Sequence, residues 1–320
     1  MKNTGLIIDN KIRDNIFLGS SGNDNLIVNE QRDWTLYLPD KEYQRKAFDT
    51  WNCVAFSACN ALEIYFNWAI KNKKISSNNY AWLVENGYII NGRINFSDRF
   101  VGTKAGTKVG VGNTGSRVAN AIHVAGLVPE KLWSFGLNME AKEYYKNTPP
   151  ELDILGKEFV KRFDIRFESF WVKDIEEALQ YAPAQVYVNA WYKKNGVYYN
   201  PNEKINHAVV KIRQTTKQIF DSYDPFVKTL KTNYKYFASG YKYSFNEVIN
   251  NMIVEEFLRD NDLLFVRNTK TGQFGRIMQE KLKVVETEDR GTLLLLDEAV
   301  RKNGRALTEE EWDILPKEQF

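Results

Sequence analysis

The feature that most constrains the fold is an apolar stretch from Cys53 to Ile70, CVAFSACNALEIYFNWAI. Its apolar residues occupy all sides of a helix, and Ala55, Ala58 and Ala61 fall where another element could approach closely. A helix that is apolar on every face is buried. We therefore expect this segment to be the central helix of a sizeable core.

The composition predicts a folded chain without a nucleic-acid or membrane partner. Of the 320 residues, 43% are hydrophobic and 14% aromatic, enough to build a core. The net charge is +3, and charges of both signs are mixed along the chain. No apolar run is long enough to span a bilayer, and the N-terminus lacks the features of a signal peptide.

The two cysteines and two histidines limit the chemistry. Cys53 and Cys59 lie six positions apart, which on one helix separates them by about 9 Å along the axis. A disulfide needs Cα atoms within roughly 7 Å, so we expect no disulfide and a reducing compartment. Together with His123 and His207 the two cysteines make four possible ligands, but their positions in the sequence lack the spacing of zinc ligands. We expect no metal and no cofactor.

Hydrophobic periodicity and turn residues give the order of elements. Helices come first and strands later, which predicts an α+β domain. We expect Ser116 to cap a helix that stops at Gly126. The expected strands are 34–38, 164–172, 184–192, 207–214 and 217–223; the expected helices are 53–70, 117–126, 155–163, 173–182 and 244–259; and 97–116 is expected to be a loop.

The sequence changes character after about residue 262. A hairpin is expected to turn at TKTG, followed by a helix over 292–304 and a short last helix with Thr308 and Glu311 as a capping box. We expect residues 262–320 to be an appended module that docks a partner protein.

Cys53 stands where the central helix is expected to begin. The partial positive charge of a helix N-terminus stabilises a thiolate, and backbone N–H groups there can face an oxyanion. The alternative is that Cys53 packs in the core as a small hydrophobic residue, as free cysteines often do. The helix position alone leaves both readings open.

Six segments between residues 44 and 226, taken in their order along the chain, favour the reading of Cys53 as a nucleophile. They are CVAFSACNALE, INFSDRFVG, GNTGSRVANAIHVAGLVPEKLWSF, DIEEALQYAPAQVYVNAW, GVYYNPNEKINHAVVKI and FDSYDP. As an ordered set they resemble the papain-like cysteine peptidase superfamily. A looser similarity links the chain to papain-like proteins encoded by tailed bacteriophages.

The resemblance implies a papain-like two-lobed α+β fold, with a helical lobe holding the nucleophile helix and an antiparallel β-sheet lobe. It divides the chain into an N-terminal extension, 1–43, a papain-like domain, 44–261, and the small C-terminal module, 262–320. The family's disulfides are missing. The resemblance therefore implies a distant, non-secreted relative, cytoplasmic or associated with a virion.

The resemblance also assigns roles to residues. It implies that Cys53 is the nucleophile, His207 the general base and Asp221 the residue that orients the imidazole, where the family usually has Asn. The usual oxyanion-hole glutamine, six residues before the nucleophile, is replaced by Ala47, and Gln44 is the candidate for that role. Asp224 is the rival of Asp221, although Asp before Pro is often a turn residue.

The implied activity is hydrolysis of peptide bonds, in a protein or a cell-wall peptide, through a covalent thioester. The alternative is a structural or binding protein, for example a phage virion or tail component, with an inactive papain-like fold.

Three further features receive a structural interpretation. GVGNTG fits the G-x-G-x-x-G pattern at Gly110, Gly112 and Gly115, but TKAGTKV before it is not the strand that a dinucleotide site requires. We expect a loop beside the substrate cleft. His123 is expected to pack on its helix, and Cys59, about 240° around the helix from Cys53, is expected to lie in the core.

Overall fold

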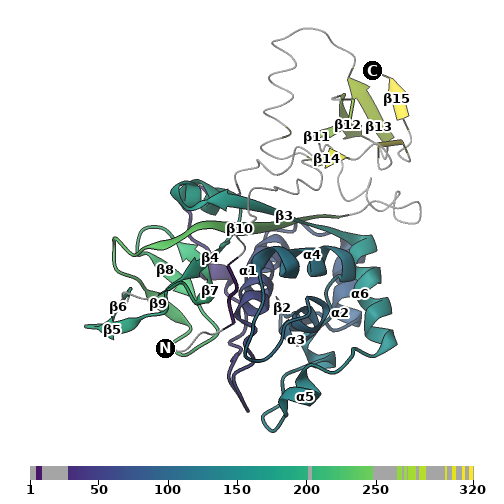
Figure 1. Ribbon diagram of the computed structural model, residues 1–320. Helices are drawn as coiled ribbons and strands as arrows, with labels where there is room; N and C mark the ends of the chain where they lie inside the picture. Colours follow the sequence, from purple (N-terminus) through teal and green to yellow (C-terminus); the bar gives the residue numbers. More distant parts are fainter. Residues whose placement is uncertain are drawn as a thin grey trace.

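The computed structural model describes residues 5–8, 28–200 and 204–247, together with short stretches between 265 and 319. Between residues 28 and 247 the chain forms two lobes, one of helices and one built on a twisted sheet (Figure 1). The expected α+β fold with a helical lobe and an antiparallel sheet lobe is thus observed.

The helical lobe surrounds the predicted central helix, α1, which runs from Cys53 to Lys71 and is buried along most of its length. It packs against α3 (Asp98–Lys104) and α4 (Gly115–Ala125) and against strands β7 (His207–Arg213) and β10 (Tyr236–Glu247). The other elements of the lobe are α2 (Ser77–Glu85), β1 (Ile89–Ile90), β2 (Arg93–Ile94), α3 (Asp98–Lys104), α4 (Gly115–Ala125), η2 (Glu130–Leu132), α5 (Ala141–Tyr144) and α6 (Pro150–Arg162).

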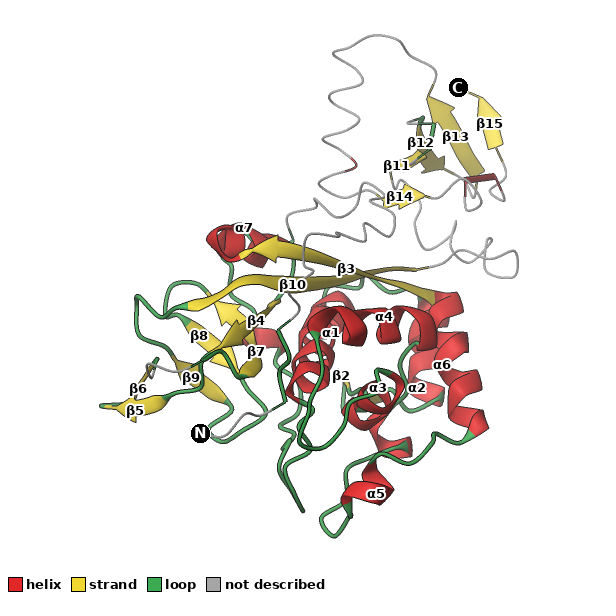
Figure 2. Cartoon of the chain, in the orientation of Figure 1, coloured by secondary structure: helices red, strands yellow, loops and turns green. Residues whose placement is uncertain are grey.

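The sheet lobe is a six-stranded antiparallel sheet in the order β3-β10-β4-β7-β8-β9 (Figure 2). Strands β4 and β7 lie inside it and are buried along almost their whole length, as expected for strands covered on both faces. The elements are η1 (Thr35–Tyr37), β3 (Phe163–Trp171), η3 (Val172–Asp174), α7 (Ile175–Tyr181), β4 (Ala184–Val188), β7 (His207–Arg213), β8 (Gln218–Phe220), β9 (Val227–Thr229) and β10 (Tyr236–Glu247), with a separate hairpin of β5 (Tyr192–Lys194) and β6 (Val197–Tyr199).

The C-terminal residues that the structure describes form a sheet of their own. The predicted hairpin is present as the antiparallel pair β11 and β12, with a turn at 270–271. The strands are β11 (Phe265–Asn268), β12 (Phe274–Met278), β13 (Lys281–Val285), β14 (Arg305–Leu307) and β15 (Lys317–Gln319), in the order β14-β11-β12-β13-β15. Most of the helix expected over 292–304 and the capping-box residues lie outside the described residues, and the domain limits remain a prediction.

Four local expectations were wrong. Residues 35–37 form the 3-10 helix η1 instead of a strand, because Trp34 is anchored by its backbone N–H to the carbonyl of Ile212 and by Nε1 to that of Leu179. The expected loop 97–116 contains α3, whose first turn is capped by Ser97. Thr114, not Ser116, caps α4 by accepting from the Arg117 N–H.

The fourth error concerns the helix expected over 244–259. Residues 244–247 are the last part of β10, which pairs with β3 over nine consecutive residues. The apolar face of that long pair, including Phe245 stacked on Phe66 of α1, outweighs the helical pattern. Residues 248–259 lie outside the described residues. Within the described parts of the chain, no helix has the length and apolarity needed to cross a membrane.

Candidate active site

Cys53 is the first residue of α1 and is fully buried. The turn before it contains Trp51 with a left-handed backbone, φ 59°, a conformation that is uncommon outside glycine. The side chain of Asn52 fixes this turn to the helical lobe by donating from Nδ2 to the carbonyl of Asp98 and to the hydroxyl of Tyr144. The thiol therefore stands at the positive end of a buried helix dipole.

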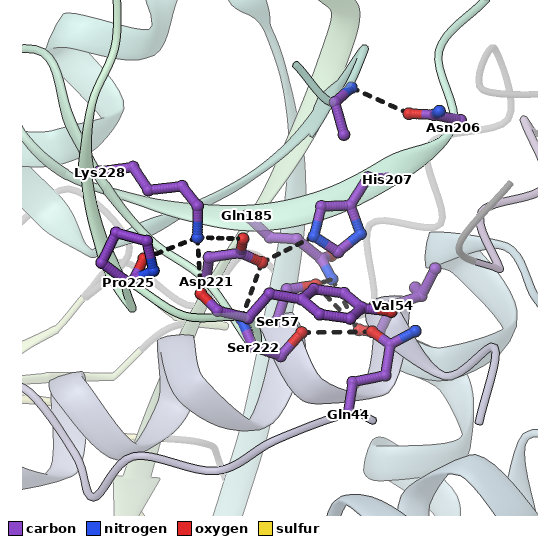
Figure 3. Close-up of polar contacts among 12 residues, drawn as sticks. Gln44, Val54, Ser57, Gln185, Asn206, His207, Asp221, Ser222, Pro225 and Lys228 are labelled. Atoms are coloured by element: carbon purple, nitrogen blue, oxygen red, sulfur yellow. Dashed lines mark hydrogen bonds and ion pairs between the residues drawn. The ribbon is translucent and has the colours of Figure 1, made fainter. Parts of the chain in front are cut away.

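His207 begins β7, opposite Val188 of β4, and its side chain is also buried. Its Nε2 lies 2.7 Å from Oδ1 of Asp221. A carboxylate can only accept, so Nε2 carries the hydrogen and donates it. The imidazole also makes a side-chain hydrogen bond with Cys53. The close-up shows the imidazole facing the Asp221 carboxylate (Figure 3).

Two aromatic rings hold the imidazole. The rings of Trp191 and Tyr223 meet it edge to face, with centroids 5.7 Å and 5.5 Å away. Tyr223 is in turn fixed by its hydroxyl, which donates to Oδ2 of Asp49 at 2.9 Å. The orientation of His207 is therefore set from several sides, with little freedom to leave Cys53 or Asp221.

Asp221 directly follows β8, and its backbone N–H donates to the carbonyl of Phe226. Its carboxylate accepts three hydrogen bonds. Oδ1 accepts from His207 and from the Ser222 N–H at 2.8 Å, and Oδ2 accepts from Nζ of Lys228 at 2.7 Å. Such a carboxylate is held in its charged form.

The electrostatics of the pair favour an imidazolium. Burial alone would lower the pKa of His207, but the charge and hydrogen bond of Asp221, with a further contribution from Cys53, raise it to about 10. Burial would raise the pKa of Asp221, yet His207 and Lys228 lower it overall. The charged form of each partner is thus stabilised by the other.

Gln44 lies close to this group and is fully buried. Its Oε1 accepts from the hydroxyl of Ser222 at 3.2 Å, and its Nε2 donates to Oδ1 of Asp49 at 3.1 Å. Its backbone N–H donates to the carbonyl of Ser222. The structure therefore brings Gln44 next to the Asp221 turn, while its role at an oxyanion remains a prediction.

Asp224 is exposed on the turn after Asp221. The structure brings Asp221, not Asp224, against His207. Of the rival assignments for the third residue, only Asp221 has the required geometry.

The other cysteine and histidine lie apart from this group. Cys59 is buried, and burial together with the nearby charge of Asp98, to which it is hydrogen-bonded, raises the pKa of its thiol well above the usual value. It is not joined to Cys53 by a disulfide. His123 is half-buried on α4, with Nδ1 3.0 Å from the carbonyl of Ile165. In the part of the chain that the structure describes, no cluster of His, Cys, Asp and Glu could hold a metal ion.

The Gly-rich segment is a loop between α3 and α4, as expected. Residues 5–8 lie along it: the Ile7 N–H donates to the carbonyl of Asn113 at 2.7 Å, and the Asn113 N–H donates to that of Gly5 at 2.8 Å. Gly5 also lies directly against the carbonyl of Trp51. The loop and the N-terminal segment therefore lie beside the turn that carries Cys53.

Sequence reasoning missed Lys228, Tyr223 and Asp49. A lysine in a short strand and an aspartate in a loop normally face solvent, and nothing local marks them as partners of a site. Only the pairing of β8 with β9 shows where Lys228 lies, because it sets Lys228 opposite Ile219, close to Asp221.

Three solved structures are similar to this chain, and two of them carry the name cysteine protease. Xylellain from Xylella fastidiosa is 16% identical with a TM-score of 0.43, and covers 66% of this chain and 84% of its own. The proform of the ragweed pollen allergen Amb a 11 is 14% identical with a TM-score of 0.40, and covers 68% and 66%. Digestive procathepsin L 3 from Tenebrio molitor larval midgut is 10% identical with a TM-score of 0.37, and covers 66% and 68%.

The match thus spans about two thirds of the Amb a 11 proform. No family model matches the sequence, and no curated protein matches it.

Proposed function

We propose that the chain is a cysteine peptidase that cleaves peptide bonds through a thioester on Cys53. The observation that carries this proposal is the buried series of contacts from the Cys53 thiol to the His207 imidazole and on to the Asp221 carboxylate. A nucleophile, a base within hydrogen-bond reach and a third group that orients the base are what covalent catalysis by a thiol requires.

The proposed reaction has two halves. The thiolate of Cys53 attacks the peptide carbonyl carbon, and the imidazolium of His207 gives its proton to the amine as the C–N bond breaks. Water then attacks the thioester while His207 accepts a proton from it, which releases a carboxylic acid and restores the Cys53 thiolate beside the His207 imidazolium. Asp221 keeps the imidazole in place and stabilises its charged form.

The oxyanion would be stabilised by N–H groups at the first turn of α1. Gln44 is the side-chain candidate for a further donor, because its amide lies beside Ser222 in the same part of the site. Variants Gln44→Glu and Gln44→Ala test this role, since both should lower kcat with a smaller effect on KM. Removing one oxyanion donor typically costs roughly 100-fold or more in kcat.

The experiment uses two substrate pools, one of peptides from unfolded protein and one of cell-wall cross-link peptides, because either class fits the proposal. Cleavage is followed by mass spectrometry for the wild type, Cys53→Ala and Cys59→Ala. We expect cleavage by the wild type and by Cys59→Ala, and none by Cys53→Ala. Cleavage of neither pool, or equal activity of both cysteine variants, would contradict it and favour a binding protein with an inactive fold.

A further inference from the structure

Lys228 is a buried lysine with an unusual set of partners. It lies on β9, and its side chain is 2% exposed. Its Nζ is 2.7 Å from Oδ2 of Asp221, 2.6 Å from the carbonyl of Tyr223 and 2.6 Å from that of Pro225. Its Nζ also lies 5.2 Å from the ring centre of Trp191. The close-up shows the lysine reaching the carboxylate from the side away from His207 (Figure 3).

The contacts define the charge of this lysine. A carboxylate and two carbonyls carry no hydrogen, so all three hydrogen bonds must be donated by Nζ, and only an ammonium has three N–H donors. Burial lowers the pKa of Lys228, but the charge and hydrogen bond of Asp221 oppose this. An uncharged amine would leave one of the three acceptors without its donor.

The same contacts connect the parts of the site. Lys228 ties Asp221 to the Tyr223 carbonyl, and the ring of Tyr223 packs against His207. Tyr223 reaches Asp49, which accepts from Gln44, which in turn accepts from Ser222 beside Asp221. One ammonium therefore closes a ring of contacts around the imidazole.

We propose that Lys228 is a positioning residue of the active site, which sets the proton affinity of His207 through Asp221 and fixes the turn that carries Tyr223. This inference rests on the proposed function and deepens it. The carboxylate alone would hold the imidazolium proton tightly, and a tightly held proton is a poor one to donate to a leaving amine. The Lys228 ammonium, on the other oxygen of the Asp221 carboxylate, offsets part of the attraction between that carboxylate and the imidazolium proton.

The sign of the effect follows from Coulomb's law. Removing a buried positive charge raises the proton affinity of the groups around it, so the pKa of His207 should rise when Lys228 is neutralised. The ionisable groups facing His207 are Asp221, Cys53 and Tyr223, and those acting on Lys228 are Asp221, Asp224 and Lys193, with Tyr198 nearby. A purely structural role would change stability or rate but not move this pKa in that direction.

The test is a histidine NMR titration, which needs neither substrate nor access to the thiol. The chain has two histidines, so ring ¹³C-labelled histidine gives two signals, assigned with His123→Gln. The titration is done in the full chain with Cys53→Ala, so that His207 titrates without an ionisable thiol beside it. The variants added are Lys228→Met, Lys228→Arg and, as a matched control, Lys231→Met, which removes an exposed charge close in sequence.

Lys228→Met is expected to raise the pKa of His207 by about one unit, the lower end of the effect of a close charge. Lys228→Arg keeps the charge and should keep the wild-type pKa, as should Lys231→Met. An unchanged or lowered pKa in Lys228→Met, or an equal rise in Lys228→Arg, would overturn the proposal.

A second measurement covers the case in which Lys228→Met does not fold. In the wild type with labelled lysine, the Nζ signal of Lys228 should remain that of an ammonium at least until His207 loses its proton. Loss of the Lys228 proton first would overturn the proposal even without a variant. Because neither titration uses catalysis, a protein that cleaves no peptide would defeat the proposed function while these results still decide the role of Lys228.

Discussion

The imidazole of His207 and the carboxylate of Asp221 are joined by a 2.7 Å hydrogen bond with both side chains almost completely buried. The pair spans the ends of two neighbouring strands, β7 and β8, so the sheet itself fixes their separation. With Cys53 on the other side of the imidazole, the contact links the sheet lobe to the helical lobe.

Asp221→Asn should remain active, but as the pH is raised its rate should begin to fall at a lower pH than the rate of the wild type. The carboxylate raises the pKa of His207, and the mechanism needs the imidazolium form of His207 beside the thiolate. A neutral amide at position 221 would no longer stabilise this charged form. The alkaline limb of the plot of kcat/KM against pH should therefore shift to lower pH. Asp221→Ala should lose roughly 10-fold or more in rate because nothing then fixes the ring. An alkaline limb that stays in place in both variants would show that Asp221 does not act on His207.

Glu63→Gln should stabilise the protein above neutral pH. Glu63 is buried on α1, where it accepts from the Phe96 N–H at 2.7 Å, and burial, with the charge of Glu42, raises its pKa well above 4.5. The folded state then binds this proton more tightly than the unfolded state, so wild-type stability falls as pH rises above the unfolded value. Each unit of the raised pKa is worth about 1.4 kcal/mol.

Thermal unfolding at pH 4, 6 and 8 checks this prediction. The gain of Glu63→Gln over the wild type should be small at pH 4 and grow toward pH 8. Glu151→Gln, on the exposed side of α6, should follow the wild type at every pH. A constant difference between Glu63→Gln and the wild type would show that the buried carboxyl does not titrate differently in the folded state.

Gly112→Ala should detach residues 5–8 from the Gly-rich loop. An added Cβ would come within 1.9 Å of the carbonyl oxygen of Gly5, and Gly112 has a φ of +83° that disfavours side chains. Gly110→Ala is a matched control, since its φ is +80° but nothing lies within 4 Å of the added atom. Hydrogen exchange at the Ile7 amide should speed up in Gly112→Ala only; equal exchange in both variants would locate the effect in backbone strain.

A chain ending at residue 261 should fold cooperatively. The six-stranded sheet is complete with β10, which ends at Glu247, and the described strands after residue 265 pair only with one another. Circular dichroism during heating should show one cooperative transition close to that of the full chain. An insoluble product, or gradual melting, would show that the last 59 residues, 262–320, belong to the core.

The fold was predictable from the sequence where the pattern is long and strong. The helix from Cys53, with apolar residues on every side, and the buried runs at 184–188 and 207–213 kept their type because burial on all sides leaves few alternatives. Residues 244–247 were mispredicted because pairing with β3, distant in sequence, outweighs local helical periodicity. Propensity is a weak guide wherever such tertiary contacts decide.

The candidate site likewise has residues that the sequence predicts and residues that it does not. The placement of Cys53, His207 and Asp221 followed from ordered motifs, and the structure brings the three together. Lys228 could not be found in this way, because its function depends on a contact across two strands and a turn and leaves no local signature. A buried charged partner is visible only once strand register is known.

The most direct test of the account is to trap the thioester. The protein is mixed with an activated peptide ester, quenched in acid within milliseconds to seconds, and digested for mass spectrometry, with His207→Ala and Cys59→Ala treated in parallel. We expect an acyl adduct on the peptide fragment that contains Cys53 in the wild type and in Cys59→Ala, and an adduct that forms far more slowly in His207→Ala. An adduct on Cys59 instead, or the same rate with and without His207, would contradict it.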